Sequence, residues 1–335
     1  MATETTITPG AVLLLLGTLL LQSCSTTDYG SYFSDYEKNY KKQVDYRNHS
    51  VPRLGFRLYA REYGVRDNRP TFVLMHGFPD SLHLYDRLAP LLAENRHVIA
   101  FDFLGWGNSD KPVNHDYDVA SQRRDLEAVL TYFGLKQPIL VVHDASGQPG
   151  LDWALDNPDR VAALVLFNTY YGPTPTLKAP EAIARFSTPG LRRDISVWMT
   201  SHFDSLWLNG YRKQIARFIS TPELRETFQN ILGHQSLAIR PAFYALNRRL
   251  PDEVEKRRMK TAHLASFPRP VRIIFGNDDP YLNAGVAKEL HKQFPDSELF
   301  LLKNAGHFVQ IDKAHKVAAL LHDFPRQSGS KNETH

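Results

Sequence analysis

The chain lacks several signals by which cofactor-dependent or disulfide-rich proteins are recognised. Its 335 residues contain one cysteine, Cys24, so no internal disulfide can form. No spaced set of cysteine and histidine resembles a zinc site, and no glycine-rich loop resembles a phosphate-binding fingerprint. The formal charge of +4 is small and spread along the chain, and no nucleic-acid-binding motif is present. We therefore expect no cofactor, no metal and no nucleic-acid partner.

The sequence also lacks an apolar run long enough to cross a bilayer as a helix. The run Ala11–Leu21 (AVLLLLGTLLL) has only 11 residues, a length typical of the h-region of a signal peptide. It leads into Leu21-Gln22-Ser23-Cys24, which resembles a bacterial lipobox, where the cysteine is lipidated. Residues 1–24 are therefore predicted to direct export to the bacterial cell envelope, as a lipoprotein anchored to the membrane through Cys24 or as a periplasmic protein. An uncleaved apolar anchor is the alternative.

Residues 25–50 are polar and rich in tyrosine, with no steady period, and we interpret them as a tether or a strap over the domain surface. From residue 51 onward, short apolar runs alternate with helical patterns such as Ala120–Phe133 and Gly285–Phe294. Continuous apolar runs are typical of strands buried on both faces. The expected strands are Thr71–Met75, Arg96–Phe101, Pro138–Val142, Val161–Phe167, Val271–Phe275 and Glu298–Leu302.

This alternation predicts an α/β fold with a mostly parallel central sheet and helices on both faces. It stops between about 170 and 265, where the chain is aromatic-rich and helix-like. We expect 51–169 to be the first part of the core, 170–265 a helical lid inserted between core strands, 266–326 the second part of the core and 327–335 a polar tail. Such a lid would cover the carboxyl edge of the sheet, where α/β proteins bind ligands.

The stretch VVHDASGQPG, at 141–150, offers two candidate nucleophiles, Asp144 and Ser146. A nucleophile elbow is a tight strand–turn–helix connection that needs small residues two before and two after the nucleophile. Ser146 would have Asp144 and Gln148 at these positions, whereas Asp144 has Val142 and Ser146, with Gly147 next. The pattern therefore favours Asp144, although an aspartate in this place can also cap the following helix.

Two further groups follow downstream. The segment VRIIFGNDDPYL places Asp278 and Asp279 at the end of an expected strand, and LLKNAGHFVQ places His307 after the last one. Nucleophile, acid and histidine thus come in the chain order of the α/β-hydrolase triad. The chain resembles the epoxide hydrolase and haloalkane dehalogenase branch of that superfamily over nearly all of 51–326. His76-Gly77-Phe78-Pro79 resembles its oxyanion loop, and 101–112 (FDFLGWGNSDKP) its loop after the fourth strand.

The resemblance implies an Asp-His-Asp triad that works through a covalent alkyl ester. Asp144 would attack carbon, and the backbone N–H groups of Phe78 and Ala145 would form the oxyanion hole. His307 would activate water, oriented by Asp279, with Asp278 as the alternative. The substrates would be water and a small apolar organic molecule.

The leaving group separates the two reactions of this branch. Dehalogenases usually place halide-binding N–H donors at the positions of Ala145 and Phe78, where neither side chain can donate. Epoxide hydrolases supply lid tyrosines, and Tyr244 is our first choice among Tyr170, Tyr171, Tyr211 and Tyr244. Trp106 is the tryptophan on a loop expected to reach the site. We therefore expect hydrolysis of epoxides to diols. Dehalogenation, another hydrolysis and a non-enzymatic binding protein are the alternatives.

Overall fold

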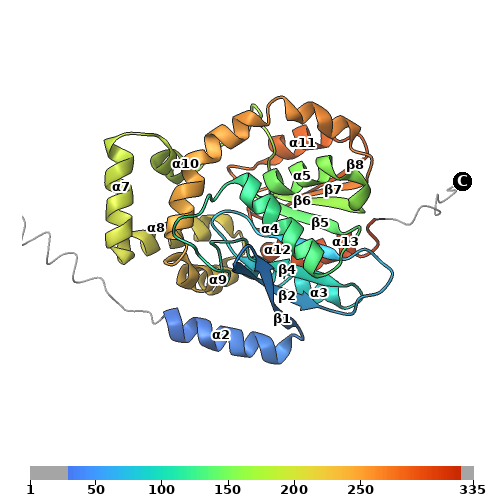
Figure 1. Cartoon of the computed structure of the whole chain (residues 1–335), viewed down its shortest axis with the longest axis horizontal. Helices are drawn as coiled ribbons and strands as arrows, with labels where there is room; N and C mark the ends of the chain where they lie inside the picture. Colours follow the sequence, from blue (N-terminus) through green and yellow to red (C-terminus); the bar gives the residue numbers. More distant parts are fainter. Residues whose placement is uncertain (1–28, 326–335) are drawn as a thin grey trace, which may run out of the picture.

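The computed structural model describes residues 29–325, so the predicted signal at 1–24, with Cys24, and the tail at 327–335 lie outside the described residues. The centre of the fold is an eight-stranded sheet in the order β1-β2-β4-β3-β5-β6-β7-β8 (Figure 1). The strands are β1 (Arg47–Arg53), β2 (Phe56–Tyr63), β3 (Phe72–Met75), β4 (Val98–Phe101), β5 (Ile139–Asp144), β6 (Ala163–Thr169), β7 (Val271–Gly276) and β8 (Ser297–Leu302).

The strands from β3 to β8 are parallel, and they correspond to the six apolar runs of the sequence. Every residue of β3, β4, β6 and β7 is buried, as expected for strands covered on both faces. The α/β-hydrolase fold class expected from the sequence is therefore confirmed. Strands β1 and β2 were not expected, and they add an antiparallel hairpin to the edge of β4.

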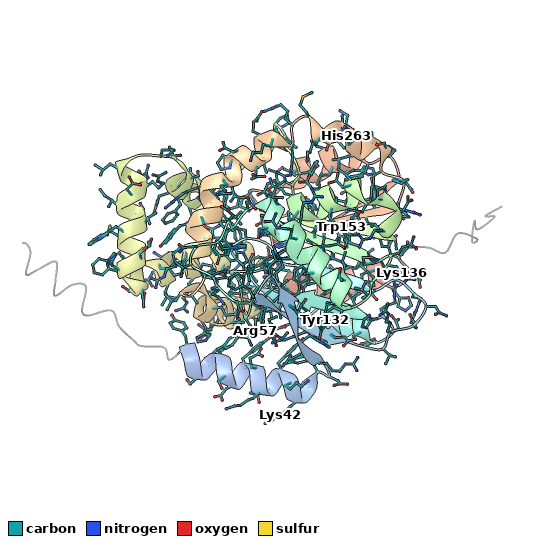
Figure 2. The ribbon with its side chains drawn as sticks, in the orientation of Figure 1. Lys42, Arg57, Tyr132, Lys136, Trp153 and His263 are labelled. Carbon is teal, nitrogen blue, oxygen red and sulfur yellow. The ribbon has the colours of Figure 1, made fainter. Side chains whose placement is uncertain are left out.

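Helices cover both faces of the sheet (Figure 1). Helices α4 (Val119–Tyr132) and α5 (Gly147–Asp156) pack on each other, and Trp153 of α5 donates from Nε1 to Glu127 of α4 at 2.7 Å. Trp153 lies on the core, away from the lid (Figure 2). Helices α3 and α13 pack together on the other face. The core helices are α3 (Ala89–Ala93), α4 (Val119–Tyr132), α5 (Gly147–Asp156), α11 (Ala284–Gln293), α12 (Val309–Asp312) and α13 (Ala314–Leu321), with 3-10 turns η1 (Leu82–Tyr85) and η2 (Pro158–Arg160).

The chain between β6 and β7 forms the helical insertion expected at 170–265. It stands to the left of the sheet in Figure 1, beyond the ends of the strands. Its elements are α6 (Glu181–Ser187), α7 (Leu191–His202), α8 (Asp204–Phe218), α9 (Pro222–Ser236), α10 (Arg240–Lys256) and η3 (Lys260–Ser266). This topology places the lid over the carboxyl edge of the parallel strands.

The polar segment expected as a tether has regular structure. Residues Tyr29–Gln43 form helix α2, which packs on lid helix α9, and residues from Arg47 onward form β1. A buried ionic cluster joins α2 to the core: Arg61 is fully buried and donates to Glu37 at 2.7 Å and to Asp86 at 3.0 Å. Residues 29–50 are therefore not a loose tether. They agree with the alternative, a strap over the domain surface, which charged pairing and tyrosine packing hold in place although the segment has no hydrophobic period.

Candidate active site

The turn after β5 has the strained geometry of a nucleophile elbow. Asp144 is the last residue of β5 and adopts φ +49°, in the left-handed region that side chains other than glycine rarely adopt. Helix α5 begins three residues later, at Gly147, where a Cβ atom would collide with the hydroxyl of Thr169. A Cβ on Gly77 would lie 2.7 Å from the Cβ of Asp144. Glycine at both positions therefore lets three segments meet around Asp144.

Ser146, the other candidate nucleophile, does not line the cavity. Its side chain is buried, and Oγ donates to the carbonyls of Met75 and His143 at 3.0 and 2.8 Å. The same oxygen accepts from the N–H of His143 at 2.8 Å. These bonds make Ser146 a structural support of the elbow, because backbone groups engage both its single proton and one of its lone pairs.

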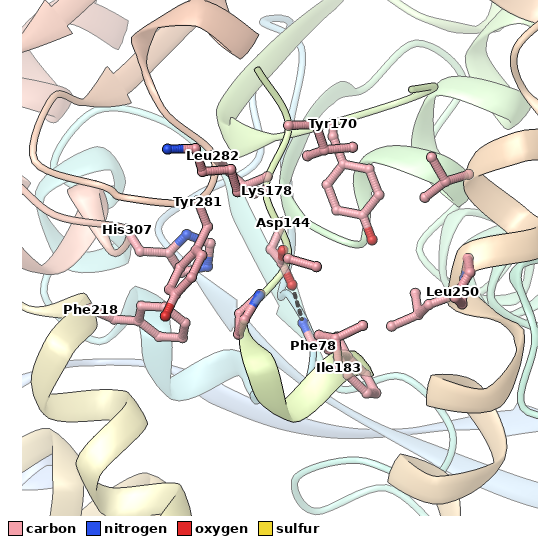
Figure 3. A pocket seen from close by; sticks show the side chains of 15 residues that line it. Phe78, Asp144, Tyr170, Lys178, Ile183, Phe218, Leu250, Tyr281, Leu282 and His307 are labelled. Carbon is pink, nitrogen blue, oxygen red and sulfur yellow. Dashed lines mark hydrogen bonds between the residues drawn. The ribbon is translucent and has the colours of Figure 1, made fainter. Parts of the chain in front are cut away.

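The carboxylate of Asp144 lies against backbone donors. The N–H of Phe78 donates to Asp144 Oδ2 at 2.9 Å (Figure 3). The backbone N–H of Ala145 also interacts with the carboxylate and lowers its pKa. Burial raises the pKa of Asp144, although the charge of His307 and these two backbone donors oppose the shift. An oxygen of this carboxylate thus already occupies the place where two N–H groups can stabilise negative charge.

His307 and Asp279 form a buried pair. His307 Nδ1 lies 2.7 Å from Asp279 Oδ2, and both residues are almost fully buried. Burial alone would lower the pKa of His307, but the charge and hydrogen bond of Asp279 outweigh it and the pKa is raised. Asp278 is exposed and accepts instead from Ser220 at 3.2 Å. Of the two adjacent acids, Asp279 is thus the one that can fix the ring.

Asp144 and His307 open into the same cavity of about 280 Å³ (Figure 3). Its walls are mostly apolar, as is usual for sites that bind small organic ligands. The lid contributes Ile183, Leu250 and Val254, and the core contributes Phe78 and Leu282. The further lining residues are Tyr170, Leu177, Lys178, Ala179, Pro180, Phe218, Pro251 and Tyr281.

The residues expected to stabilise the leaving group lie in different places relative to the cavity. Tyr244, the first choice, does not line the cavity, and its hydroxyl is paired with Thr200 Oγ1 at 2.7 Å, so the structure does not bring this side chain to Asp144. Tyr170 lines the cavity, and its hydroxyl points into it in Figure 3. Trp106 is buried behind the wall, edge-on to Phe78 at 5.5 Å between ring centroids.

The remaining lid tyrosines have partners elsewhere. Tyr171 donates to Asp152 at 2.7 Å, and Tyr211 donates to the carbonyl of Pro79 at 3.0 Å. Among the four tyrosines considered from the sequence, Tyr170 is therefore the one whose hydroxyl is directed at the cavity without a hydrogen bond to the described residues.

Sequence reasoning missed three residues of the site. Asn168, at the end of β6, donates to Asp279 Oδ2 at 3.0 Å and accepts from the N–H of Gly276 at 2.7 Å. Its position, a polar residue at the end of a buried parallel strand, was a usable signal. Tyr281 lines the cavity beside His307. Asp80 is buried next to the oxyanion loop, and burial together with the charge of Asp144 raises its pKa to about 8.

One group of described residues has the composition of a metal site. Ligand atoms of Glu37, His83 and Asp86 lie within 4.8 Å of one another. The Arg61 guanidinium already donates to both carboxylates, so its positive charge occupies the place of a cation. Within residues 29–325, no helix is long and apolar enough to span a membrane.

An α/β sheet with an aspartate elbow, a backbone oxyanion pocket and a histidine–carboxylate pair defines a hydrolase-type site. Residues 70–314 match the alpha/beta hydrolase fold family, and the chain belongs to that family. It is 28% identical to a haloalkane dehalogenase of Psychrobacter cryohalolentis over 81% of this chain and 89% of that protein. It is 36% identical to a fluoroacetate dehalogenase of Burkholderia sp over 36% of this chain and 40% of that protein. The structure of the epoxide hydrolase CorEH is similar, with a TM-score of 0.66, 21% identity and coverage of 84% of this chain and 98% of that one.

Proposed function

We propose that the protein hydrolyses epoxides to diols through a covalent ester on Asp144. The observation that carries this proposal is the presence of two groups in one cavity: the Asp144 carboxylate beside two backbone N–H groups, and the Tyr170 hydroxyl, which has no hydrogen-bond partner among residues 29–325. The first group suits attack on carbon, and the second suits the oxygen that leaves it.

In the first step, an Asp144 oxygen forms a bond to a ring carbon, the carbon–oxygen bond of the epoxide breaks, and the freed oxygen takes a proton from Tyr170. In the second step, His307 takes a proton from water, and the hydroxide attacks the carbonyl carbon of the ester. The N–H groups of Phe78 and Ala145 stabilise the resulting oxyanion. The ester bond then breaks, and the departing diol oxygen takes the proton of the newly formed carboxylic acid, so that Asp144 is again a carboxylate. The proton held by His307 returns to the Tyr170 phenolate and restores the phenol as the diol leaves.

The electrostatics favour proton transfer from Tyr170 at the right moment. Burial, followed by the negative charge of Asp144, raises the pKa of Tyr170 well above its usual range in the free enzyme. The charge on Asp144 disappears when the ester forms, so this part of the shift is lost as the ring opens. The phenol is therefore neutral before the reaction and becomes a stronger acid during it.

Dehalogenation is the second candidate, and the haloalkane dehalogenase among the relatives favours it. A halide leaving group needs N–H donors in an apolar pocket. The side chains of Ala145 and Phe78 offer none, and the indole of Trp106 does not line the cavity. The site geometry therefore favours the epoxide over the halide.

The test uses the full-length chain with His307→Phe, which blocks ester hydrolysis. This variant is mixed with a panel of epoxides, haloalkanes and activated esters, and the adduct is located by mass spectrometry. We expect a gain of the whole epoxide mass on Asp144, and no adduct when Asp144→Asn is added. A gain equal to the haloalkane minus hydrogen halide would make the enzyme a dehalogenase. An acyl group on Ser146 would refute the aspartate mechanism.

We also propose that the protein is exported and anchored to the bacterial envelope through Cys24. The support is the apolar run Ala11–Leu21 followed by the lipobox-like Leu21-Gln22-Ser23-Cys24. Incorporation of labelled palmitate in cells, lost in Cys24→Ser, is the expected result. A labelled Cys24→Ser variant, or an unlabelled native chain, would contradict it.

A further inference from the structure

Exposed apolar side chains are concentrated on one part of the lid. Half of the large hydrophobic side chains that residues 29–325 expose lie within the short stretch 191–206. They form what we call the α7 stripe: Leu191, Ile195, Trp198, Met199, Phe203 and Leu206, which are 36–76% exposed. Contiguous exposed apolar surface on a folded protein usually marks a site of interaction.

Helix α7 is amphipathic, but its apolar face is turned to the outside of the protein and its more polar face to the lid. Leu191, Ile195, Trp198 and Met199 follow helical spacing, so they share one face, and that face is turned away from the protein. The opposite face carries Thr200, whose hydroxyl pairs with Tyr244, and Val197, which is the apolar side chain of this face that packs on the core. No residue of α7 is fully buried, and the helix stands at the outer edge of the lid in Figure 1.

The dimensions of the α7 stripe argue against a protein partner. The part of the α7 stripe that lies on α7, a helix of 12 residues, is about 18 Å long and about 10 Å wide, which gives roughly 200 Å². Phe203 and Leu206 extend this area beyond the end of the helix by two side chains. A specific protein interface buries about 800 Å² on each partner. A lipid surface has no such minimum, and a helix with tryptophan and leucine on one face and arginine beside them is typical of one that lies at a bilayer interface. Arg192 is exposed next to Leu191.

The N-terminal segment joins the fold near the same surface. Tyr29, the first described residue, accepts from Arg212 Nη1 of α8 at 2.6 Å, and the guanidinium lies over its ring. Leu206 of the α7 stripe precedes Arg212 by six residues on the same helix, a distance of about 9 Å along the axis. A membrane anchor in residues 1–24, as proposed above, would thus be linked to the fold through α8, the helix that carries Leu206 at one end of the α7 stripe.

We propose that the α7 stripe of the lid docks on a lipid bilayer, with Trp198 at the level of the headgroups and Leu191 and Ile195 among the acyl chains. The chain just before α7, including Pro180 and Ile183, lines the catalytic cavity. Docking would therefore bring the lid side of the cavity to the membrane, where apolar molecules are concentrated.

Tryptophan fluorescence can test this docking directly in the full-length chain. Trp198 is 55% exposed, whereas Trp106, Trp153 and Trp207 are 1–5% exposed, so the difference between the native chain and Trp198→Phe isolates its signal. The probe is a vesicle of phosphatidylethanolamine and phosphatidylglycerol with or without brominated acyl chains, because bromine quenches only on contact. Flotation of the same samples measures binding through any part of the protein.

The proposal expects brominated lipid to quench the Trp198 signal. Leu191→Glu with Ile195→Glu should raise the lipid concentration for half-maximal quenching at least about tenfold, since two aliphatic side chains no longer enter the bilayer. Val65→Glu, which changes an exposed apolar residue outside the α7 stripe, should leave this lipid concentration unchanged. Equal thermal unfolding of the three proteins shows that the fold is intact.

Three outcomes overturn the proposal. In the first, the protein floats with vesicles while Trp198 stays unquenched, so that the anchor alone binds. In the second, the full-length chain does not float at all. In the third, Trp198 emission shifts to the blue with protein concentration in the absence of lipid, together with dimerisation, which would assign the α7 stripe to a second copy.

Discussion

The buried carboxyl of Asp80 makes a quantitative prediction about stability. Its side chain is 3% exposed, and Oδ1 has no hydrogen-bond partner among the described residues. Burial raises its pKa from the ordinary 3.8 to about 8, with a contribution from the charge of Asp144. The folded protein therefore holds a proton at neutral pH that the unfolded chain releases. Asp80→Asn keeps the size and the neutrality of the group and removes this requirement.

The magnitude follows from the difference in pKa. Between about pH 4 and pH 8, the folded state binds one more proton at Asp80 than the unfolded state, so the free energy of unfolding falls by about 1.4 kcal/mol per pH unit. At pH 7, roughly three units above 3.8, the loss reaches about 4 kcal/mol, and at pH 5 it is about 2 kcal/mol. Above pH 8 both states are ionised and the loss no longer grows.

Equilibrium urea unfolding at pH 5, 6, 7 and 8 measures the effect. Asp80→Asn should be more stable than the native chain, and the difference should widen with pH until about 8. Asp278→Asn, an exposed change that removes a carboxylate following another parallel strand, β7, controls for overall charge. A difference that does not vary with pH, or a variant less stable than the native chain at pH 7, would refute the reasoning.

Three further predictions concern other parts of the structure. In steady-state assays, Asp144→Asn should lower turnover at least about a thousandfold, whereas Ser146→Ala should keep its activity. In urea unfolding, Ser146→Ala should lose about 1–2 kcal/mol of stability. An active Asp144→Asn together with an inactive Ser146→Ala would contradict the aspartate nucleophile. His307 must be neutral to activate water, and Asp279 raises its pKa, so kcat should fall as the pH drops through a value above 6.5. Asp279→Asn should move this acidic limb of the pH–rate profile to lower pH. An acidic limb that stays in place would contradict the coupling of His307 to Asp279. Arg61→Met should lower the free energy of unfolding by about 3–5 kcal/mol, because a buried carboxylate partner loses its counter-charge. An unchanged free energy in chemical unfolding would mean that the cluster does not hold α2 to the core.

The central sheet was predictable because its strands are buried on both faces. Runs such as Val161–Phe167 and Val271–Phe275 consist mostly of apolar residues, as strands buried on both faces do. Such strands can be recognised from their own sequence, without knowing which elements pack beside them. Strand β2 carries Arg57, Arg61 and Glu62 within eight residues, and no apolar run marks it. Its burial depends on ion pairs with distant residues, which a single sequence does not reveal.

The elbow and the residues beside it could be found from local spacing, whereas the tyrosine whose hydroxyl faces the cavity could not. Asp144 was chosen over Ser146 because small neighbours are a steric requirement of the turn itself, and the structure has this turn. The choice among tyrosines depended on which hydroxyls other lid residues engage. Thr200 binds the hydroxyl of Tyr244, and the position of Thr200 is set by helix packing that leaves no trace in the local sequence.

The orientation of α7 shows a more general limit of periodicity. Leu191, Ile195 and Trp198 produce the same apolar period whether their face packs inward or outward, because the period encodes only that they share a face. The usual inference turns that face toward the core. Here Thr200 and Val197 face the lid instead, and the apolar side chains are left outside. When the apolar face of a helix points outward, its side chains gain no free energy of burial in the isolated chain. They contribute that free energy only where an apolar surface, such as the bilayer proposed here, lies against them.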